Sequence, residues 1–388
     1  MKFICEKEKL MLGLNTVSRT SVSRTTTPIL EGILMTVKED GIILTTNDSE
    51  IGMECKIEHI ESTEIGKAVV DCKMFCDIIR KLPNSEITIS VNDKNLLVIE
   101  CEGSLYKLST LKAEEFPTLP TINVEKSISI ESKMLKELIK RTIFAISLEE
   151  NRPVFTGSLF EVKDNRLNVV SVDGFRLALR KAVVKEASEN FSAIVPGKYL
   201  NEIVKNLQDT EEIVKVGISK NQALFELPNC KIVTRLLEGE FLNYNNVIPK
   251  ERETRIKVNK SSLQGAIERA SIFSITAAEK EKKYPIKMYV TIGSLIISCT
   301  SQVGDAKEEV LVKTEGKELE IGFNPKYMLD ALKAIDEEEV YLDFGSNISP
   351  CIIKSTVDDK YTYMVLPVRL KESKIYLNSL LTFYKQIV

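Results

Sequence analysis

The stretch that decides the fold is residues 71–82, which read DCKMFCDIIRKL. Two later stretches follow the same pattern, PGKYLNEIVKNL at 196–207 and NPKYMLDALKAI at 324–335. Every copy has lysine as its third residue, and these lysines are 125 and 128 positions apart (198 − 73 and 326 − 198). This period is longer than the roughly 20–50 residues of a solenoid repeat and matches the size of one domain. We therefore expect three copies of one domain in the 388 residues.

Each copy is predicted to form an amphipathic helix. In the first copy the apolar residues recur at i, i+1, i+4, i+5 and i+8, which gathers them into one stripe along a helix. The other two copies carry apolar residues at the same five positions. Asp71 is a suitable N-cap for the first helix, and Asn324 followed by Pro325 gives the third an N-cap and a proline at its first position. The stripe of the first helix consists of Met74, Phe75, Ile78, Ile79 and Leu82.

Short strands are predicted around these helices. After the first helix, Ile87, Ile89 and Val91 alternate with the polar Thr88 and Ser90, which is the period of a half-buried strand. Pairs of turn-forming residues mark the expected hairpins. They stand at 40–41, 92–93, 164–165 and 220–221.

Each repeat is thus predicted to contain the same sub-pattern twice: a strand, a helix and three further strands. The fold class is α+β, with antiparallel sheets covered on their inner face by helices. The expected domains are 1–122, 123–250 and 251–370, followed by a C-terminal extension at 371–388. A row of three similar domains is open at both ends, so homodimerisation is the expected way to close it. The additional helices of the first halves are expected around residues 8–20, 133–146 and 261–273.

Positive charge recurs on one face of the predicted helices. The whole chain carries 53 basic and 56 acidic residues, so no bulk cationic field indicates nucleic acid. In the first helix, however, Lys73 and Arg80 lie two turns apart and opposite the apolar stripe. This pattern is consistent with DNA binding; the alternative is a solvated helix face with i, i+4 ion pairs, because an acid follows each lysine by four residues. The acids are Asp77, Glu202 and Asp330, and the other cations are Lys133, Lys136, Lys140, Lys198, Lys205, Lys326 and Lys333.

No catalytic constellation is evident. His59 is the only histidine, which argues against histidine triads and H-E-x-x-H zinc sites. No phosphate-binding glycine motif occurs either. Cys72 and Cys76 could share a ligand across one helical turn, but two reduced thiols are the better interpretation, because the chain has a single histidine and no further cysteine is close in sequence. We expect no enzyme activity, no cofactor and no metal.

The chain ends and the cysteine usage indicate the compartment. The eight cysteines form no dense framework of the kind that disulfide-bonded secreted domains show. The N-terminal residues lack the apolar region of a signal peptide, and no segment reaches the roughly 18 apolar residues of a membrane span. We expect a soluble, cytoplasmic protein with no membrane partner.

Two segments carry information beyond the repeat. One is the hairpin-like SVDGFRLA at 171–178, and the other is YMVLPVRL at 363–370, an apolar strand with a proline and an arginine. Together with TPIL at 27–30, TTNDSE at 45–50 and the repeat period, they resemble the beta sliding clamps of bacterial DNA polymerase III. The resemblance covers residues 1–370. It implies a non-catalytic processivity subunit, a head-to-tail homodimeric ring of six similar domains whose helices line a channel around duplex DNA.

The resemblance also implies three sets of site residues. A cleft between the middle and last domains would bind partner peptides from the replicative polymerase, the clamp loader and other proteins with a clamp-binding motif. Channel cations would contact DNA without reading its sequence. A dimer edge would join the first domain of one copy to the third domain of the other. The cleft residues are Phe155, Val172, Gly174, Phe175, Arg176, Leu177, Leu242, Val247, Val365, Leu366, Pro367, Val368 and Arg369; the channel residues are Arg24, Lys73, Arg80, Lys133, Lys140, Lys198, Lys205, Lys326 and Lys333; the dimer-edge residues are Tyr106, Leu108, Ile272 and Phe273.

The sequence departs from the family pattern at three cleft positions and at the C-terminus. Phe175 stands where histidine or tyrosine is common, Leu242 where proline is common, and Asn246 where some members have a basic residue. Members usually end at the counterpart of Leu370, whereas here an extension follows. Its SLLTF at 379–383 resembles the apolar motifs that clamps bind, and we hypothesise that the extension competes for the cleft. The alternative is a frayed or neighbour-packed chain end.

Two other functions remain as alternatives. One is a clamp-like homodimeric interaction scaffold, from a mobile element or a paralogue, whose altered cleft has changed its choice of partner. The other is an enzyme of unknown type on repeated α+β domains, for which catalytic residues are missing. Trapping on circular but not linear DNA distinguishes a clamp from an enzyme. Competition by a polymerase C-terminal peptide distinguishes a clamp from the scaffold.

Overall fold

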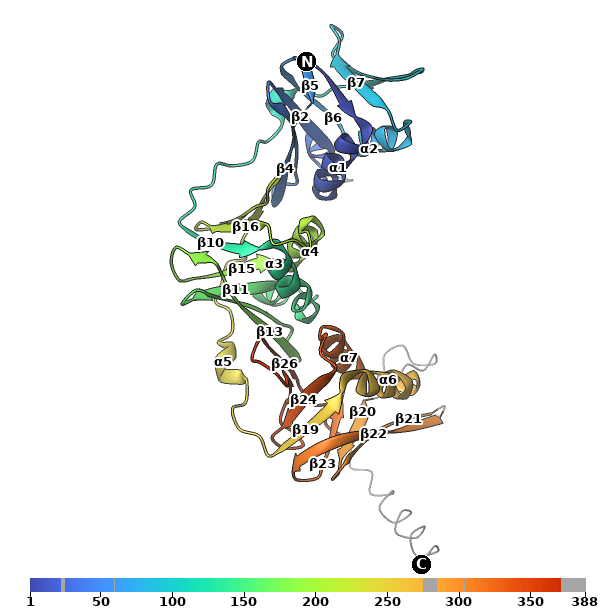
Figure 1. Cartoon of the computed structure of the whole chain (residues 1–388), viewed down its shortest axis with the longest axis vertical. Helices are drawn as coiled ribbons and strands as arrows, with labels where there is room; N and C mark the ends of the chain where they lie inside the picture. Colours follow the sequence, from blue (N-terminus) through green and yellow to red (C-terminus); the bar gives the residue numbers. More distant parts are fainter. Residues whose placement is uncertain (22–24, 59, 275–284, 303, 371–388) are drawn as a thin grey trace, which may run out of the picture. The chain divides into compact units, whose positions relative to one another are not determined.

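The computed structural model describes residues 1–21, 25–58, 60–274, 285–302 and 304–370 (Figure 1). The chain divides into two compact units. Unit 1 consists of Met1–Ser171 and Arg180–Phe241, and unit 2 consists of Val172–Leu179 and the chain from Leu242 onward. Unit 2 thus combines the third repeat with a hairpin from the second. Three features of the sequence-based predictions lie outside the described residues: Arg24, His59 and the extension at 371–388.

The first repeat follows the predicted order twice. Strands β2, β3 and β4 pair antiparallel in sequence order, and β7, β8 and β9 do the same. A short strand that was not predicted, β5 (Glu61–Glu64), pairs with β1. The elements are β1 (Lys2–Glu6), α1 (Lys7–Val17), β2 (Gly32–Lys38), β3 (Gly41–Asn47), β4 (Ile51–Glu58), β6 (Gly66–Asp71), α2 (Cys72–Lys81), β7 (Glu86–Val91), β8 (Leu96–Cys101) and β9 (Ser104–Ser109).

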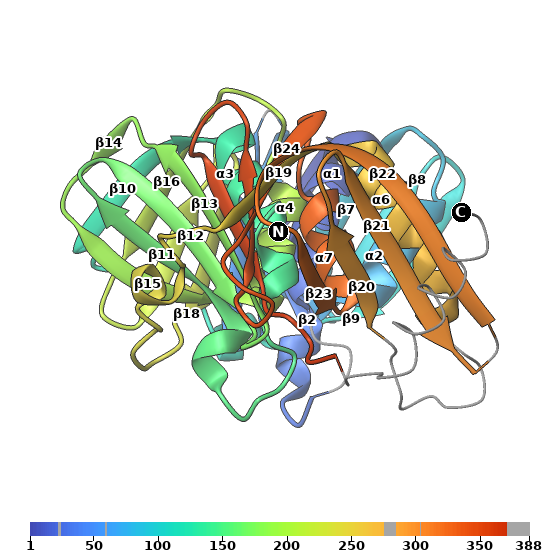
Figure 2. The ribbon, with the colours of Figure 1, turned by 90° about the horizontal axis from the view of Figure 1, so that it is seen from below.

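The second repeat has the same order and shares a sheet with the first. Strand β18 pairs antiparallel with β4, so a nine-stranded sheet runs in the order β14-β10-β16-β17-β18-β4-β3-β2-β6. In Figure 2, β11 and β12 run side by side, as their antiparallel register requires. The elements are β10 (Lys126–Glu131), α3 (Ser132–Lys140), β11 (Gly157–Lys163), β12 (Arg166–Val172), β13 (Arg176–Val183), β14 (Glu186–Ala187), β15 (Phe191–Pro196), α4 (Gly197–Asn206), β16 (Ile213–Ile218), β17 (Gln222–Glu226) and β18 (Cys230–Arg235).

The third repeat completes the predicted pattern in unit 2. The Arg176–Leu179 part of β13 lies next to β26, and the sheet continues through β25, β24, β19, β22, β21, β20 and β23. The elements are α5 (Tyr244–Val247), β19 (Thr254–Asn259), α6 (Lys260–Ala270), β20 (Ile286–Val290), β21 (Ser294–Ser301), β22 (Gly304–Gly316), β23 (Leu319–Phe323), α7 (Pro325–Lys333), β24 (Glu339–Phe344), β25 (Cys351–Ser355) and β26 (Tyr361–Val365). The predicted α+β class and the repeated βαβββ pattern are therefore confirmed.

Helix α2 begins as its sequence predicts but buries a stripe that is shifted from the predicted one. The Asp71 carboxylate accepts a hydrogen bond from the Met74 backbone N–H at 2.6 Å, which satisfies one of the free donors at the helix start. Phe75 and Ile79 are fully buried, whereas Met74 is exposed. Cys72 and Cys76 are buried beside them, so the buried stripe is shifted around the helix toward these cysteines and leaves Met74 outside the core. In α7, Asn324 caps the helix and Pro325 occupies its first turn, as predicted.

The helices of the first halves are shorter than predicted. They end at Val17, Lys140 and Ala270, and a short 3₁₀ turn follows each one, at 18–20, 143–145 and 271–274. After α3 the Thr142 hydroxyl donates to the Leu138 carbonyl at 2.8 Å and so takes over one of the acceptors at the helix end. The apolar periodicity continues through these turns, which is why the sequence pattern overestimated the helix lengths.

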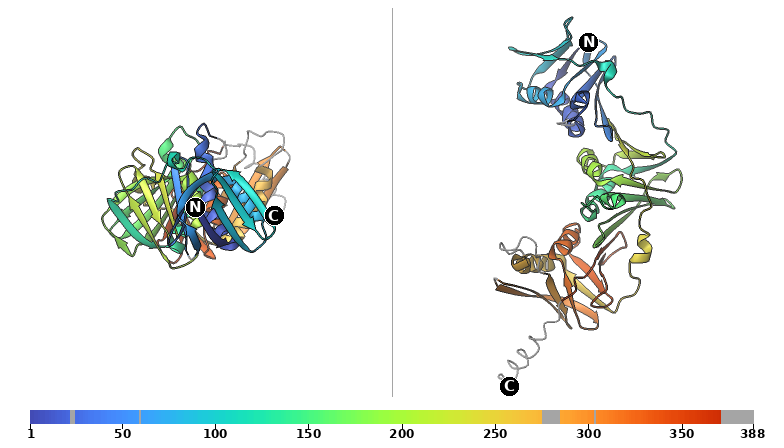
Figure 3. Two further views of the ribbon diagram at one scale, coloured as in Figure 1. Left: turned by 90° about the horizontal axis from the view of Figure 1, so that it is seen from above. Right: turned by 180° about the vertical axis from the view of Figure 1, so that it is seen from behind.

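The two helices of each repeat lie side by side: α1 with α2, α3 with α4, and α6 with α7 (Figure 1). Their inner faces pack on the sheets, and buried side chains of α1, α2, α3 and α4 share one apolar core with the strands of unit 1. Figure 3 shows the ribbon from above and from behind, where the helices of unit 1 again lie against its sheets. Each pair therefore presents its outer face to solvent. Within the described residues, no helix is long and apolar enough to cross a membrane.

Candidate functional site

The hairpin of unit 2 is organised by one aspartate. The Asp173 carboxylate accepts hydrogen bonds from the backbone N–H groups of Phe175 and Arg176, at 2.9 and 3.0 Å. This side-chain turn holds Gly174 at a φ of +91°, a conformation that glycine adopts without strain. As a result the Phe175 side chain projects outward and is 59% exposed.

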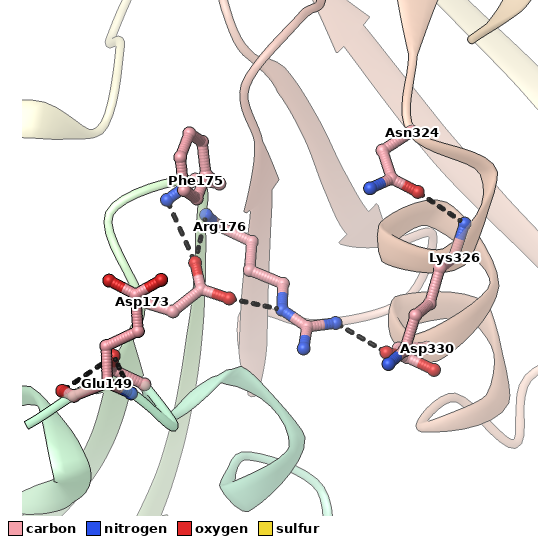
Figure 4. A network of polar contacts seen from close by, with 8 residues as sticks. Glu149, Asp173, Phe175, Arg176, Asn324, Lys326 and Asp330 are labelled. Carbon is pink, nitrogen blue, oxygen red and sulfur yellow. Dashed lines mark hydrogen bonds and ion pairs between the residues drawn. The ribbon is translucent and has the colours of Figure 1, made fainter. Parts of the chain in front are cut away.

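Arg176 ties this hairpin to helix α7. Its guanidinium donates to Asp173 Oδ2 at 2.9 Å and to Asp330 Oδ2 at 2.5 Å (Figure 4). It also lies over the Tyr327 ring, 4.6 Å from the centroid. The residue is only 8% exposed. A buried charge is tolerated only when it is paired in this way, so the two carboxylates fix the position of the hairpin on α7.

An apolar surface is built on this ion-pair network. The Phe175 ring stacks on Tyr327, with centroids 6.2 Å apart and an interplanar angle of 21°. The Leu366 N–H donates to the Phe175 carbonyl at 2.8 Å, which brings the end of β26 against the hairpin. Pro367 has no N–H to continue the ladder, and the Val368 N–H donates instead to the Gly322 carbonyl of β23, at 2.8 Å. The chain after β26 thus forms a second wall beside Phe175.

The predicted cleft residues fall into three groups. Val172, Arg176, Leu177 and Val365 are buried. The three apolar side chains can form a floor but cannot contact a partner directly, and Arg176 is held in the ion-pair network described above. Phe155 belongs to unit 1, where it packs edge-on against Phe241 with ring centroids 5.8 Å apart. The remaining members are exposed or half-buried in unit 2 and are available to a partner: Gly174, Phe175, Leu242, Val247, Leu366, Pro367, Val368 and Arg369.

Three residues of this arrangement were missed by the sequence analysis. Tyr327 was assigned to the apolar stripe of its helix, and Asp330 to the repeated surface acids. Asp173 lies inside the quoted hairpin but was given no role. In the first two copies the equivalent acids bind a cation of their own helix three residues later, through Asp77–Arg80 and Glu202–Lys205, both at 2.7 Å. No feature of the sequence shows that the third acid turns to Arg176 instead.

The cations on the helices form the second candidate surface. All eight predicted channel residues that the structure describes are exposed. The alternative interpretation expected each lysine to pair with the acid four residues later. In the first two copies these acids pair instead with the cation three residues after them. Lys73, Lys133, Lys140, Lys198 and Lys326 form no ion pair with another described residue.

The electrostatic effect of these lysines is seen at a neighbouring acid. A hydrogen bond from Lys136 holds the pKa of Asp209 below its ordinary value, and the positive charges of Lys140 and Lys133 lower this pKa further. Three lysines of α3 therefore act on one exposed carboxylate. A phosphate group at this face would experience the same attraction.

The predicted dimer-edge residues lie on exposed parts of two repeats. Tyr106 is on β9, at the edge of the five-stranded sheet β5-β1-β7-β8-β9, and lines a hollow of about 390 Å³ together with Met74 and Ile78 of α2. Leu108 is half-buried on the same strand. In the third repeat Ile272 is 67% exposed and Phe273 is half-buried. The apolar spacing of α2 predicted a core position for Met74 and Ile78, but both side chains line this hollow.

No metal centre is evident in the described part of the chain. No group of three or more His, Cys, Asp or Glu side chains is arranged there so that it could hold a metal ion. Cys72 and Cys76 are both buried in α2, and all eight cysteines are free thiols. These two cysteines therefore have no third ligand with which to hold an ion.

Comparison with known proteins places the chain in a family. Models of the DNA polymerase III beta subunit match its N-terminal domain at residues 1–120, its central domain at 129–243 and its C-terminal domain at 245–369. The chain belongs to the beta sliding clamp family. The Beta sliding clamp of Staphylococcus epidermidis is 37% identical over 95% of this chain and 99% of its own length. That of Halalkalibacterium halodurans is 34% identical over 95% and 100%.

A solved clamp structure shares the whole three-domain architecture. The DNA polymerase sliding clamp of Bacillus subtilis superposes with a TM-score of 0.91 at 34% identity, covering 96% of this chain and 100% of that one. The resemblance that the sequence motifs indicated is thereby confirmed. These relatives are matched over nearly their full length, and only a small part of this chain has no counterpart in them.

Proposed function

We propose that this chain is a DNA sliding clamp, which encircles duplex DNA as a head-to-tail homodimer and tethers the replicative polymerase for processive DNA replication. Membership of the family supports the clamp function. The hairpin at 172–179 is the observation that supports partner binding. Arg176 fixes this hairpin to α7, and the hairpin exposes the Phe175 side chain to a partner. The first repeat has an equivalent hairpin, in which Asp48 accepts hydrogen bonds from the backbone N–H groups of Glu50 and Ile51. What is particular to residues 172–179 is therefore the exposed Phe175 and the Arg176–Asp330 ion pair, which the shared fold does not explain.

The proposed role of the chain is non-catalytic. We assign it to the cytoplasm, with domains at 1–122, 123–250 and 251–370 and an extension at 371–388. Its proposed partners are double-stranded DNA without sequence preference, a second copy of itself, the replicative polymerase, the clamp loader and other proteins with a clamp-binding motif. The proposed cleft consists of the thirteen residues named from the resemblance together with Tyr327, and Phe155 is included on the resemblance alone.

The topology of the DNA tests the proposed function. After loading, the protein should remain on nicked circular DNA and be lost when the circle is linearised, because a closed ring leaves only over a free end. Gel filtration of the loaded DNA measures the retained fraction. Equal retention on circular and linear DNA would contradict encirclement and favour a protein that binds a local site.

Substituting Lys198 with glutamine is expected to reduce the salt dependence of DNA binding. Each phosphate contact contributes about 0.9 to the slope of log K against log salt concentration, and each homodimer loses two lysines. We therefore expect the slope to fall by about 1 to 2 without any change in sequence preference. Fluorescence anisotropy over a salt series measures it. Lys163→Gln, an exposed lysine on the β11–β12 hairpin, is the matched control and should leave the slope unchanged.

Asp330→Asn is expected to weaken the binding of a polymerase C-terminal peptide about 10-fold, because a hydrogen bond to a charged group contributes about 1.5–3 kcal/mol. The substitution keeps the shape of the side chain but removes the charge that holds Arg176 on α7. Isothermal titration calorimetry measures the affinity. The control is Asp77→Asn, which removes the equivalent acid from the first repeat. Equal effects of the two substitutions would show that Asp330 has no special role in positioning the hairpin.

Deletion of residues 371–388 is expected to raise the affinity for the same peptide several-fold if the extension competes for the cleft. The extension contains nine apolar or aromatic residues among eighteen, and it follows directly from the wall at 366–370. The control is a full-length chain in which Leu380, Leu381 and Phe383 are replaced by serine. Unchanged affinity in both variants would leave the extension as an ordinary chain end.

The clamp-like scaffold remains the second candidate. The altered cleft positions Phe175, Leu242 and Asn246 favour it, because they change the surface that a partner would meet. It would form the same homodimer but fail to bind the polymerase peptide at micromolar concentrations. The titration described above therefore distinguishes the two functions.

A further inference from the structure

Two cysteines face each other where the first two repeats share their sheet. In the antiparallel pairing of β4 with β18, Cys55 is the direct partner of Cys230. At the next position the Lys56 N–H donates to the Asn229 carbonyl at 2.9 Å, which makes that pair the hydrogen-bonded one. Hydrogen-bonded and non-hydrogen-bonded pairs alternate along an antiparallel ladder. Cys55 and Cys230 therefore form a non-hydrogen-bonded pair.

This geometry suits a covalent bond between the two sulfurs. Residues in a non-hydrogen-bonded pair have Cα atoms about 4.5 Å apart and side chains on the same face of the sheet. Disulfides span Cα separations of about 4.4–6.8 Å. The typical Cα separation of such a pair thus lies within the range that a disulfide spans.

A cavity gives small molecules a route to both thiols. Cys55 and Cys230 are each 7% exposed, and both line a cavity of about 440 Å³ between α1 and the β17–β18 turn. Burial raises the pKa of the Cys55 thiol to about 11. Burial also raises the pKa of Cys230, and the adjacent Cys55 raises it further, as expected for neighbouring sulfurs. The reaction of these thiols is therefore slow, because little thiolate is present at neutral pH.

The pair is distinct from the other cysteines of the chain. Among the pairings of described strands, no other cysteine faces a cysteine. Cys72 and Cys76 are neighbours, but they occupy successive turns of one helix, so a bond between them would not connect separate elements. A cross-link at 55–230, in contrast, joins two repeats.

We propose that Cys55 and Cys230 form a reversible disulfide across the β4–β18 ladder when the protein meets a low-molecular-weight disulfide oxidant. One protein thiolate attacks the oxidant and forms a mixed disulfide, which releases one small thiol. The second protein thiolate then attacks the protein sulfur of that mixed disulfide and releases the other small thiol. The protein dithiol is thereby oxidised by two electrons and the oxidant is reduced to two thiols.

The bond would fasten the first repeat to the second. It closes a chain segment of 175 residues (230 − 55), a long loop for which chain-entropy arguments give a large stabilising effect. Separation of β4 from β18 would then require reduction of the bond. The proposal does not depend on the proposed function, because it follows from the register of one pair of strands.

The test uses the full chain with excess oxidised glutathione at mildly alkaline pH for about 24 h, a period suited to slow exchange of buried thiols. Free thiols are then alkylated, and non-reducing peptide mapping by mass spectrometry identifies the linked residues. We expect a linked 55–230 peptide as the main product, a loss of two hydrogens from the intact mass and a thermal midpoint raised by several degrees. Dithiothreitol should reverse all three changes.

Matched variants make the outcome decisive. Cys55→Ala and Cys230→Ala should abolish both the linked peptide and the rise in thermal midpoint, whereas Cys72→Ala should leave both in place. The absence of a 55–230 peptide from the oxidised native chain would overturn the proposal. So would mixed glutathione disulfides that persist on these cysteines, or linkage to other cysteines at equal frequency.

Discussion

Phe175→Ala is expected to weaken the binding of a polymerase C-terminal peptide about 30-fold or more. Truncation of a central aromatic residue at an interface commonly costs about 2 kcal/mol or more, which corresponds to that factor. Phe175 has the features of such a residue: it is 59% exposed, stacked on Tyr327 and held by the Leu366–Phe175 backbone hydrogen bond. Because the side chain contributes little to the core, we expect the thermal midpoint to change by no more than a degree or two.

Two further variants define the basis of this effect. Phe175→Tyr keeps the ring that stacks on Tyr327 and should retain most of the affinity. Ile292→Ala removes an apolar side chain that is 85% exposed on the β20–β21 turn and should have no effect. A loss of affinity in Ile292→Ala equal to that in Phe175→Ala would show that the peptide binds any exposed apolar group. An unchanged affinity in Phe175→Ala would remove this residue from the proposed cleft.

Ile272→Asp is expected to convert the homodimer into monomers and to abolish retention on circular DNA. The substitution places a carboxylate in a contact that the proposed assembly makes apolar, opposite Tyr106 of the second copy. An unpaired charge buried at an interface costs several kcal/mol, so we expect the dissociation constant of the dimer to rise at least about 100-fold. Sedimentation velocity over a range of concentrations measures it.

The fold of the monomer should survive this change, because the Ile272 side chain is 67% exposed in the single chain. Ile292→Asp introduces the same charge at the β20–β21 turn and should leave the dimer intact. Tyr106→Ala tests the other side of the contact and should weaken the dimer in the same direction. A stable dimer in Ile272→Asp that still stays on circular DNA would place the interface elsewhere.

The repeated elements could be predicted from the sequence because each rests on local chemistry. The N-caps Asp71 and Asn324, the apolar spacing of α2 and the alternation in β7 are all read within a few residues. The structure has these elements where the sequence predicts them. The helices of the first halves, however, end several residues before their apolar pattern ends. Helix ends depend on side chains such as Thr142 that compete for the last carbonyls, and periodicity does not report this competition.

The site was predicted less completely because its contacts are distant in sequence. The motif around Phe175 could be recognised in the sequence. Asp330, which binds Arg176 of this motif, lies 154 residues after that arginine. Asp330 also occupies the same repeat position as Asp77 and Glu202, whose partners lie on their own helices. Met74 and Ile78 were assigned to the core for a similar reason, since an apolar residue on a helix gives no indication of whether a sheet or a second protein covers it.

The placement of Val172–Leu179 limits where this chain can be divided into independent fragments. This hairpin is encoded in the second repeat but belongs to the compact unit of the third, where Arg176 needs the carboxylate of Asp330. A third repeat produced without this hairpin would leave the Asp330 carboxylate without its partner Arg176. A cut between the second and third repeats is therefore expected to leave the third repeat unstable, unless residues 172–179 are supplied with it.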